Sequence, residues 1–136
     1  METIFSKIIS REIPADIVYE DELVLAFLDI KPINYGHTLV IPKKAFTNIF
    51  DGDAETLAHM MKIGHKIGLA LKNEGLATGV NLIMNNGESA GQEVWHSHLH
   101  VVPRLDNDHA FSHPKHIETT KEILAETKEK LFAALK

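Results

Sequence analysis

The chain has 136 residues, 44% of them hydrophobic, which is enough for one buried core and too few for two comfortable domains. A formal net charge of -5 at pH 7, with no basic patch outside an acid-mixed C-terminal stretch, argues against a nucleic-acid groove. The absence of cysteine excludes disulfides and thiolate chemistry, and no apolar run approaches the roughly 18 residues of a membrane span or forms a signal segment after the first residues, so we expect a cytoplasmic protein that binds no membrane.

The first half of the chain predicts a short helix, three strands and a long helix. Residues 4–10 favour the short helix, residues 17–19 and 23–28 a hairpin, and residues 38–41 a buried strand with His37 at its mouth. From Asp53, a typical N-cap, apolar residues recur at helical spacing until a stop at residues 73–75; they are Leu57, Met60, Met61, Ile63, Ile67 and Leu71. Such a stripe indicates a core face, and His59 and His65 on the same helix are interpreted as surface or packing residues.

The second half predicts two more strands, at residues 80–84 and 94–102, separated by a loop. After Arg104 the chain is loop-like, and residues 118–135 predict a terminal helix with four apolar residues towards one side, Ile123, Leu124, Leu131 and Leu135. The expected fold class is therefore α+β: a five-stranded antiparallel sheet with one main helix packed on it, a short N-terminal helix and a C-terminal tail helix.

Three histidines in strict alternation, His96, His98 and His100, occupy the last predicted strand. Because a strand turns successive side chains to opposite faces, all three imidazoles are expected on one side. A lone histidine is usually a satisfied or solvent-facing residue, but a row of three favours a chemical role. A metal is one such role; at about 3.3 Å per residue, however, His96 and His100 lie about 13 Å apart, too far to converge easily on one ion. The other is acid, base and nucleophile chemistry on a bound anion.

The loop of residues 85–92, Asn-Asn-Gly-Glu-Ser-Ala-Gly-Gln, lies directly before this row. Small and glycine residues can turn backbone N–H groups towards phosphate oxygens, although the same letters also form ordinary turns. Its position next to the histidines makes it a candidate phosphate-binding loop.

Residues 96–102 resemble the motif of the histidine-triad (HIT) family, His-x-His-x-His followed by two apolar residues. Segments 3–9, 25–30, 36–43 and 91–96 are similar, in the expected order, to the successive blocks of the nucleotide-binding phosphoramidase branch of that family. The resemblance runs from Thr3 to about Arg104. It implies a HIT domain over residues 1–104, with the loop and helix of residues 105–136 as part of the same domain and associated with a dimer partner.

The resemblance also implies roles for particular residues. His98 matches the nucleophile, while His100 and His37 match the groups that bond the phosphate and its proton network, which His96 supports. Asp29 matches the acid that grips the ribose hydroxyls. Some members carry serine near the leaving group at the position of Glu93. The remaining nucleotide-binding positions are an apolar purine slot, Ile4, Phe5, Ile8, Phe27 and Ile30, and the phosphate loop with its exit, Asn85, Gly91, Gln92, Glu93 and Val94.

The implied activity is cleavage of purine nucleoside 5'-phosphoramidates, or related acyl-nucleotides, to the nucleoside monophosphate through a nucleotidyl-histidine, without a cofactor. Two alternatives stay open: a dinucleoside polyphosphate hydrolase, for which no extra basic cluster is evident, and a nucleotide-binding regulatory module with incidental hydrolysis. Members of the family pair through their sheets and place C-terminal residues near the partner's site. A homodimer is therefore expected, with a tail that shapes leaving-group preference.

The resemblance implies no metal site in this chain. Some relatives hold a structural zinc with two cysteines, a histidine after the Ile-Pro-Lys segment, and the first histidine of the triad. The corresponding positions here are Thr3, Ser6, Ala45 and His96. One imidazole cannot make a four-coordinate site, so we expect no zinc.

Overall fold

The computed structural model describes residues 2–136, and its N-terminal half follows the predicted order of elements. Helix α1 (Ile4–Ile9) begins at Thr3, whose hydroxyl accepts a hydrogen bond from the backbone N–H of Ser6 while the Ser6 hydroxyl accepts one from the N–H of Thr3. Strands β1 (Ile17–Glu20), β2 (Val24–Leu28) and β3 (Thr38–Pro42) follow. These elements are confirmed. They could be predicted because the sequence signals for each of them lie within a few residues of one another.

Helix α2 (Ala54–Asn73) begins after Asp53, whose carboxylate accepts a hydrogen bond from the N–H of Thr56 at 2.8 Å. Strand β4 (Gly79–Ile83), a 3-10 turn η1 (Glu88–Ala90), strand β5 (Leu99–Arg104) and helix α3 (Lys121–Ala134) complete the chain. The five strands form one antiparallel sheet in the order β1-β2-β3-β5-β4. The predicted fold class is confirmed.

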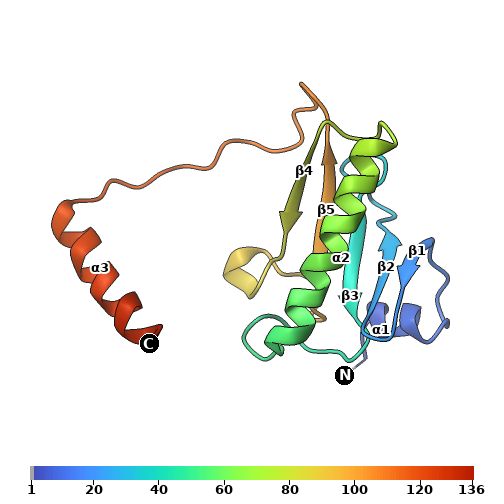
Figure 1. Cartoon of the computed structure of the whole chain (residues 1–136), viewed down its shortest axis with the longest axis horizontal. Coiled ribbons are helices and arrows are strands. Elements are labelled where there is room, and N and C mark those ends of the chain that lie inside the picture. The colour runs from blue at the N-terminus through green and yellow to red at the C-terminus, as the bar shows by residue number, and fades with distance from the viewer. Residues whose placement is uncertain (1) are drawn as a thin grey trace.

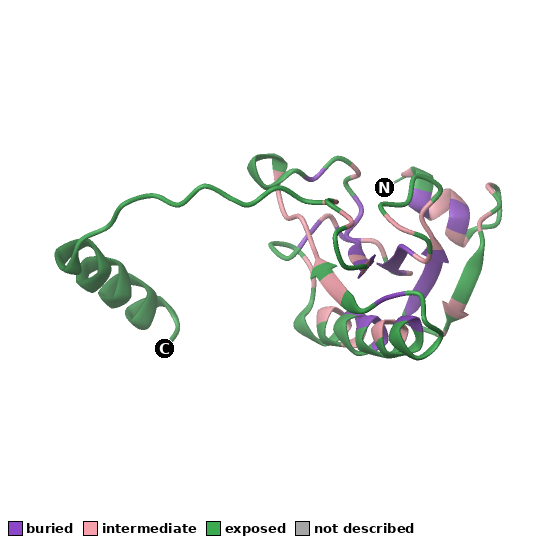
Figure 2. Ribbon diagram, turned by 90° about the horizontal axis from the view of Figure 1, so that it is seen from above, coloured by how far each residue is buried: buried purple, intermediate pink, exposed green. Residues whose placement is uncertain are grey.

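The sheet carries a separate apolar core on each face, and α1 and α2 lie on opposite sides of it (Figures 1 and 2). On the α2 face, Val24, Val40, Leu99 and Val101 pack with the buried stripe of the helix that includes Met60, Ile63 and Leu71. On the α1 face, residues of opposite parity in the same strands pack with the helix: Leu25, Phe27, Leu39 and Ile41 meet Phe5 and Ile8. The period of two along the strands thus sorts the side chains into two layers.

The prediction that the last strand begins at residue 94 is wrong, because β5 begins at Leu99. Strand β3 ends at Pro42, which has no N–H to donate, and the carbonyl of Pro42 is bonded instead by the ring of His96 at 2.9 Å. The backbone N–H of Ser97 meanwhile donates to the carbonyl of Phe46. Side-chain and loop partners therefore replace the sheet ladder before Leu99.

The C-terminal tail stands away from the sheet. Every residue from Phe111 to Lys136 is exposed, and α3 lies at the end of an extended segment, far from α1 and α2 (Figures 1 and 2). Among the described residues, no helix is long and apolar enough to cross a membrane.

Candidate active site

The histidine row lies on the α1 face of the sheet, where β3 and β5 run side by side. Leu39 of β3 is opposite His100 of β5. His37 precedes Leu39 by two residues and lies on the same face, so its ring comes close to the ring of His100. The ring centroids of His98 and His100 are 4.9 Å apart, those of His37 and His100 5.2 Å, and Phe5 of α1 stands edge-on to His96 and His98. The structure thus brings the four predicted histidines together, although only His100 lies in a strand.

Hydrogen bonding fixes which nitrogen of His98 carries the proton. Its Nδ1 lies 2.7 Å from the carbonyl oxygen of His96, and because a carbonyl can only accept, Nδ1 must donate. In the neutral ring, Nε2 then holds a free lone pair. Nε2 has no hydrogen-bond partner among the described residues. Every fully buried side-chain nitrogen or oxygen of those residues does have a partner, so Nε2 of His98 must be accessible to solvent. The ring therefore presents a nucleophilic nitrogen to solvent.

A second chain of hydrogen bonds sets the tautomers of His37 and His100. The backbone N–H of Ile33 donates to Nδ1 of His37 at 3.1 Å, so Nε2 of a neutral His37 carries the proton. That Nε2 lies 3.0 Å from Nδ1 of His100 and donates to it. The ring of His100 must then carry its own proton on Nε2, which gives an N–H donor beside the free lone pair of His98. Such a donor is suited to a negatively charged phosphoryl oxygen.

All four imidazoles are poised in the neutral form near pH 7. Burial lowers the pKa of His37, His96 and His98 below the ordinary value, and nearby Asp29 opposes this only in part at His37 and His98. At His100, burial together with the charges of His98 and His37 lowers the pKa to about 4. A neutral imidazole is what nucleophilic attack requires, because the protonated ring has no free lone pair.

His96 differs from the other histidines because both its ring nitrogens are used by the protein. Nε2 donates to the carbonyl of Pro42, and Nδ1 accepts from the hydroxyl of Thr3 at 3.2 Å. The residue is fully buried. Its carbonyl, in turn, holds Nδ1 of His98. His96 therefore joins α1, the end of β3 and the neighbouring histidine, and it can orient His98 without touching a ligand.

The residues of the expected purine slot divide into buried and open members. Phe5, Ile8 and Phe27 belong to the core of the α1 face, with the rings of Phe5 and Phe27 5.6 Å apart, whereas Ile4 is half exposed and Ile30 is 87% exposed. Asp29 lies beside His37. One carboxylate oxygen of Asp29 accepts from the N–H of Lys31 and the other lies 3.6 Å from Nε2 of His37. The carboxylate of Asp29 thus places a hydrogen-bond acceptor beside His37, one of the residues expected to bind the phosphate.

The loop of residues 85–92 is held from within by Gln92. Its side-chain nitrogen donates to the carbonyls of Thr47 and Val94, and its oxygen accepts from Asn48 and from the N–H of Gly87. The amide is therefore fully used by the protein, and Gln92 sets the shape of the loop rather than offering a side-chain donor. Val94, which follows it, packs against the core of the α1 face.

Two other loop residues remain available. Gly91 has a φ of +89°, a conformation that side chains disfavour, and the side-chain nitrogen of Asn85 lies 3.9 Å from where a β-carbon of Gly91 would be. The amide of Asn85 is half-buried and makes no side-chain hydrogen bond among the described residues. It is a free donor in the loop that precedes the histidines. Glu93 is exposed nearby on the chain.

A compact trio could hold a divalent cation. Ligand atoms of Asp29, His37 and His100 all lie within 4.8 Å of one another. Nε2 of His37 and Nδ1 of His100, however, are joined by a hydrogen bond of 3.0 Å. A cation bound to both nitrogens would have to replace the proton of this hydrogen bond. The sequence did not predict this trio, because it depends on the pairing of β3 with β5. As the chain is folded here, His37 and His100 share a hydrogen bond and Asp29 lies beside them.

Several supporting residues carried no sequence signal. The amide of Asn48 is buried against Gln92, and the side chain of Asn86 accepts from the N–H of Ile49, tying the phosphate-loop candidate to the segment before α2. His59, expected as a surface or packing residue, bonds the carboxylate of Asp21 at 2.6 Å, which the hydroxyl of Tyr19 also contacts. Burial alone would raise the pKa of Asp21, but these hydrogen bonds and two from backbone N–H groups lower it well below its usual range.

Comparison with known proteins points in one direction. The HIT domain family matches residues 10–107. Purine nucleoside phosphoramidase of Escherichia coli strain K12 is 49% identical over 105 residues, which cover 74% of this chain and 86% of that protein. Other relatives of similar identity have names that say only that they are HIT-like.

Solved structures agree with this match. A crystal structure of a HIT family protein from Bacillus anthracis is 41% identical, with a TM-score of 0.90 over 99% of this chain and 98% of that chain. A Zn-bound histidine triad family protein from Mycobacterium smegmatis is 38% identical, with a TM-score of 0.78 over 98% of both chains. The first of these likenesses extends over the C-terminal tail as well as the sheet.

Proposed function

The chain belongs to the HIT family, and on that premise we propose that it cleaves purine nucleoside 5'-phosphoramidates to the nucleoside monophosphate and an amine. The observation that carries the proposal is the pair of nitrogens at the centre of the site. His98 offers a lone pair fixed by the carbonyl of His96, and His100 offers an N–H fixed by His37. A nucleophile and an oxyanion donor side by side are what displacement at phosphorus needs.

In the first step, Nε2 of His98 attacks the α-phosphorus. A bond forms between this nitrogen and phosphorus as the bond from phosphorus to the amine breaks. The N–H of His100 and the free amide of Asn85 meet the charge on the phosphoryl oxygens. The amine leaves more readily once it is protonated. Glu93 is exposed, so solvent can supply that proton on its side of the site.

In the second step, water attacks the phosphorus of the nucleotidyl-histidine. The bond from phosphorus to Nε2 of His98 breaks and the nitrogen regains its lone pair. The water gives up a proton to solvent, which balances the proton taken up by the amine, and the nucleoside monophosphate is released. Asp29 accepts hydrogen bonds from the ribose hydroxyls and the exposed Ile30 covers the base, which keeps the phosphorus in place through both steps. Splitting one displacement into two is the gain of covalent catalysis.

A comparison of two substrates tests this proposal against its enzymatic alternative. Adenosine phosphoramidate should turn over much faster than diadenosine tetraphosphate, because the sequence shows no extra basic cluster for a long polyphosphate leaving group. The reverse order would favour a dinucleoside polyphosphate hydrolase. Binding of adenosine monophosphate with no turnover of either compound would favour a regulatory nucleotide-binding module.

We expect the protein to purify without stoichiometric zinc. The hydroxyl of Thr3 takes the place of a thiolate beside His96 and is satisfied by a hydrogen bond to that ring, while the hydroxyl of Ser6 bonds the backbone of Thr3. Neutral hydroxyls are poor zinc ligands compared with thiolates. Metal analysis of untagged protein should find well under one zinc per chain, and EDTA should leave turnover unchanged. One zinc per chain would overturn this prediction.

We also propose a homodimer. Strand β4 forms one edge of the sheet, and a shallow groove lies between it and α2. Its lining is mostly glycine and apolar residues, with one histidine: Gly64, His65, Gly68, Leu69, Val80 and Leu82. An exposed sheet edge beside apolar side chains favours pairing with a second copy. Sedimentation at micromolar concentration should give about twice the chain mass of 15.2 kDa. A fully active monomer would contradict the expectation.

A further inference from the structure

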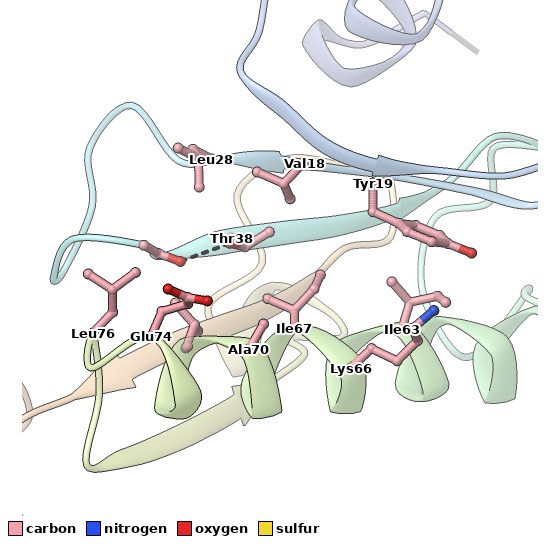
Figure 3. Close-up of a pocket in the computed structure, with 12 residues that line it drawn as sticks. Val18, Tyr19, Leu28, Thr38, Ile63, Lys66, Ile67, Ala70, Glu74 and Leu76 are labelled. Atoms are coloured by element: carbon pink, nitrogen blue, oxygen red, sulfur yellow. Dashed lines mark hydrogen bonds between the residues drawn. The ribbon is translucent and has the colours of Figure 1, made fainter.

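The segment that leads His37 into β3 is a tight turn. The N–H of His37 donates to the carbonyl of Asn34 at 3.1 Å, and Gly36 between them has a φ of +97°. A positive φ at the third residue is what a type II turn requires, and glycine adopts it readily. Figure 3 views the apolar pocket beside α2, where the hydroxyl of Thr38 donates to the carbonyl of Gly36 at 2.8 Å, drawn as a dashed line. Hydrogen bonds thus define the direction in which His37 leaves the turn.

Ile33, the residue before this turn, selects the tautomer of His37. Its backbone N–H donates to Nδ1 of His37, so Nε2 of the neutral ring holds the proton and donates to Nδ1 of His100. Without this N–H the pair of rings has a second arrangement, in which Nδ1 of His37 holds the proton and His100 donates from its own Nδ1. Nε2 of His100 then carries a lone pair, which repels a phosphoryl oxygen. The place of one backbone N–H therefore decides whether His100 offers a donor or an acceptor.

Asn34 connects this turn to β5. Its side-chain nitrogen donates to the carbonyl of Pro103 and to Oδ2 of Asp108, both at 2.9 Å. A carbonyl and a carboxylate only accept, so the nitrogen of the amide must face them. Among the described residues, the side chain of Asn34 is the only one of residues 30–36 that makes a hydrogen bond, and it is half-buried between exposed neighbours. Asn34 is therefore the side chain that fixes the turn against β5.

The carboxylate of Asp108 is itself fixed before it meets Asn34. It accepts two hydrogen bonds from the guanidinium of Arg104, at 2.6 and 2.9 Å, and two more from backbone N–H groups. These bonds hold the pKa of Asp108 far below its usual range, so the group is charged near pH 7. The residues on either side, Asn107 and His109, have φ values of +60° and +52°, which side chains disfavour. Two disfavoured backbone conformations are thus maintained where the carboxylate contacts Asn34.

We propose that Asn34 and Asp108 are positioning residues, which keep the proton of His100 on Nε2, where it can meet a phosphoryl oxygen. The contacts between them are continuous. Asp108 bonds Asn34, and the backbone N–H of the preceding residue bonds the ring of His37. That ring in turn bonds His100. The inference rests on the proposed function, because it explains what maintains the donor that the chemistry uses.

The tautomers themselves provide the first test. Protein labelled with ¹⁵N-histidine is compared with its Asn34→Ala and Asp108→Ala variants by long-range proton–nitrogen correlation spectroscopy, which distinguishes a protonated ring nitrogen from a bare one. In the unchanged protein, His37 and His100 should each carry the proton on Nε2 alone. In both variants the rings should lose this single arrangement, with Nδ1 protonated in part or all of the molecules. Circular dichroism checks that each variant is folded.

Asn81→Ala is the matched control. The amide of Asn81 accepts a hydrogen bond at 2.9 Å from the same guanidinium that bonds Asp108, so this variant also loses one bond of the cluster. Asn81 makes no hydrogen bond to the turn among the described residues, and both tautomers should stay as in the unchanged protein. Asp108→Asn is a milder change, because its amide oxygen can still accept from Asn34. It should restore the tautomers that Asp108→Ala loses.

Turnover of adenosine phosphoramidate gives the second readout. Asn34→Ala and Asp108→Ala should each lower kcat by about ten- to a hundredfold. This is less than the ~10²–10³ expected for removing an oxyanion donor outright, because part of the molecules keeps the productive tautomer. Asn81→Ala should keep the turnover of the unchanged protein.

Unchanged tautomers in folded Asn34→Ala protein would overturn the proposal, and so would changed tautomers with full turnover. An equal change in Asn81→Ala would overturn it too, because the whole cluster rather than its bond to the turn would then be responsible. If Asp108→Ala does not fold, Asn34→Ala decides the outcome alone. If the unchanged protein does not cleave adenosine phosphoramidate, the proposed function fails by itself, since the tautomers are measured without substrate and still decide whether these residues position His100.

Discussion

Replacing His98 by alanine is expected to lower turnover of adenosine phosphoramidate by on the order of a thousandfold or more, because it removes the nitrogen that attacks phosphorus. The apolar slot and Asp29 remain in place in this variant, so the affinity for adenosine monophosphate should change little. Steady-state kinetics with titration calorimetry for the product separates the two effects. Circular dichroism of the variant checks that the fold is retained.

His96→Ala is the informative comparison. This ring has both nitrogens bonded to Thr3 and Pro42, so it acts by positioning the neighbouring carbonyl, and its loss should lower turnover less than the loss of His98. The thermal stability should fall more, since a buried residue with two partners leaves both of them unsatisfied. Near-normal turnover of the His98→Ala protein would end the covalent account.

Acidification from pH 7 to pH 5 is expected to destabilise the fold strongly. In the unfolded chain imidazoles titrate near pH 6.5, whereas burial holds the pKa of His100 at about 4 and lowers that of His37, His96 and His98 as well. Below about pH 6.5 the unfolded state therefore binds protons that the folded state does not. The free energy of unfolding falls as the pH drops, by roughly 2 kcal/mol at pH 5 from His100 alone.

Urea unfolding at fixed protein concentration, followed from pH 8 to pH 5, measures this dependence. The free energy of unfolding should be nearly flat above pH 7 and fall steadily below it. His100→Gln should flatten the slope, because one depressed imidazole is removed, whereas His113→Gln, in the exposed tail, should keep the slope of the unchanged protein. A wild-type slope in the His100→Gln protein would show that another group carries the effect.

Local signals explain what the sequence could predict of this fold. Thr3 and Asp53 are N-caps, and each bonds a backbone N–H only three residues away. The alternation of His96, His98 and His100 places their rings on the same side of the chain, as the sequence predicts. These features depend on neighbours in the sequence. The start of β5 was predicted wrongly because it depends on Pro42 and Phe46, which lie about fifty residues away and give their carbonyls to His96 and Ser97.

The fine structure of the site could not be read from the sequence for the same reason. The bond between His37 and His100 requires the register of β3 on β5, and the tautomer of His98 depends on a backbone carbonyl. In the sequence, the position of Gln92 matches a phosphate ligand. In the structure, however, its side-chain N–H groups donate to the carbonyls of Thr47 and Val94.

Capture of the covalent intermediate tests the central claim most directly. Wild-type protein is mixed with excess adenosine phosphoramidate, quenched within milliseconds, digested and analysed by mass spectrometry under conditions that preserve the bond between phosphorus and nitrogen. We expect an added adenylyl group on the peptide that contains residues 95–104, with fragmentation placing it on His98, and no adduct in the His98→Ala protein. An adduct on any other residue, or rapid turnover of substrate with no adduct at any quench time, would contradict it.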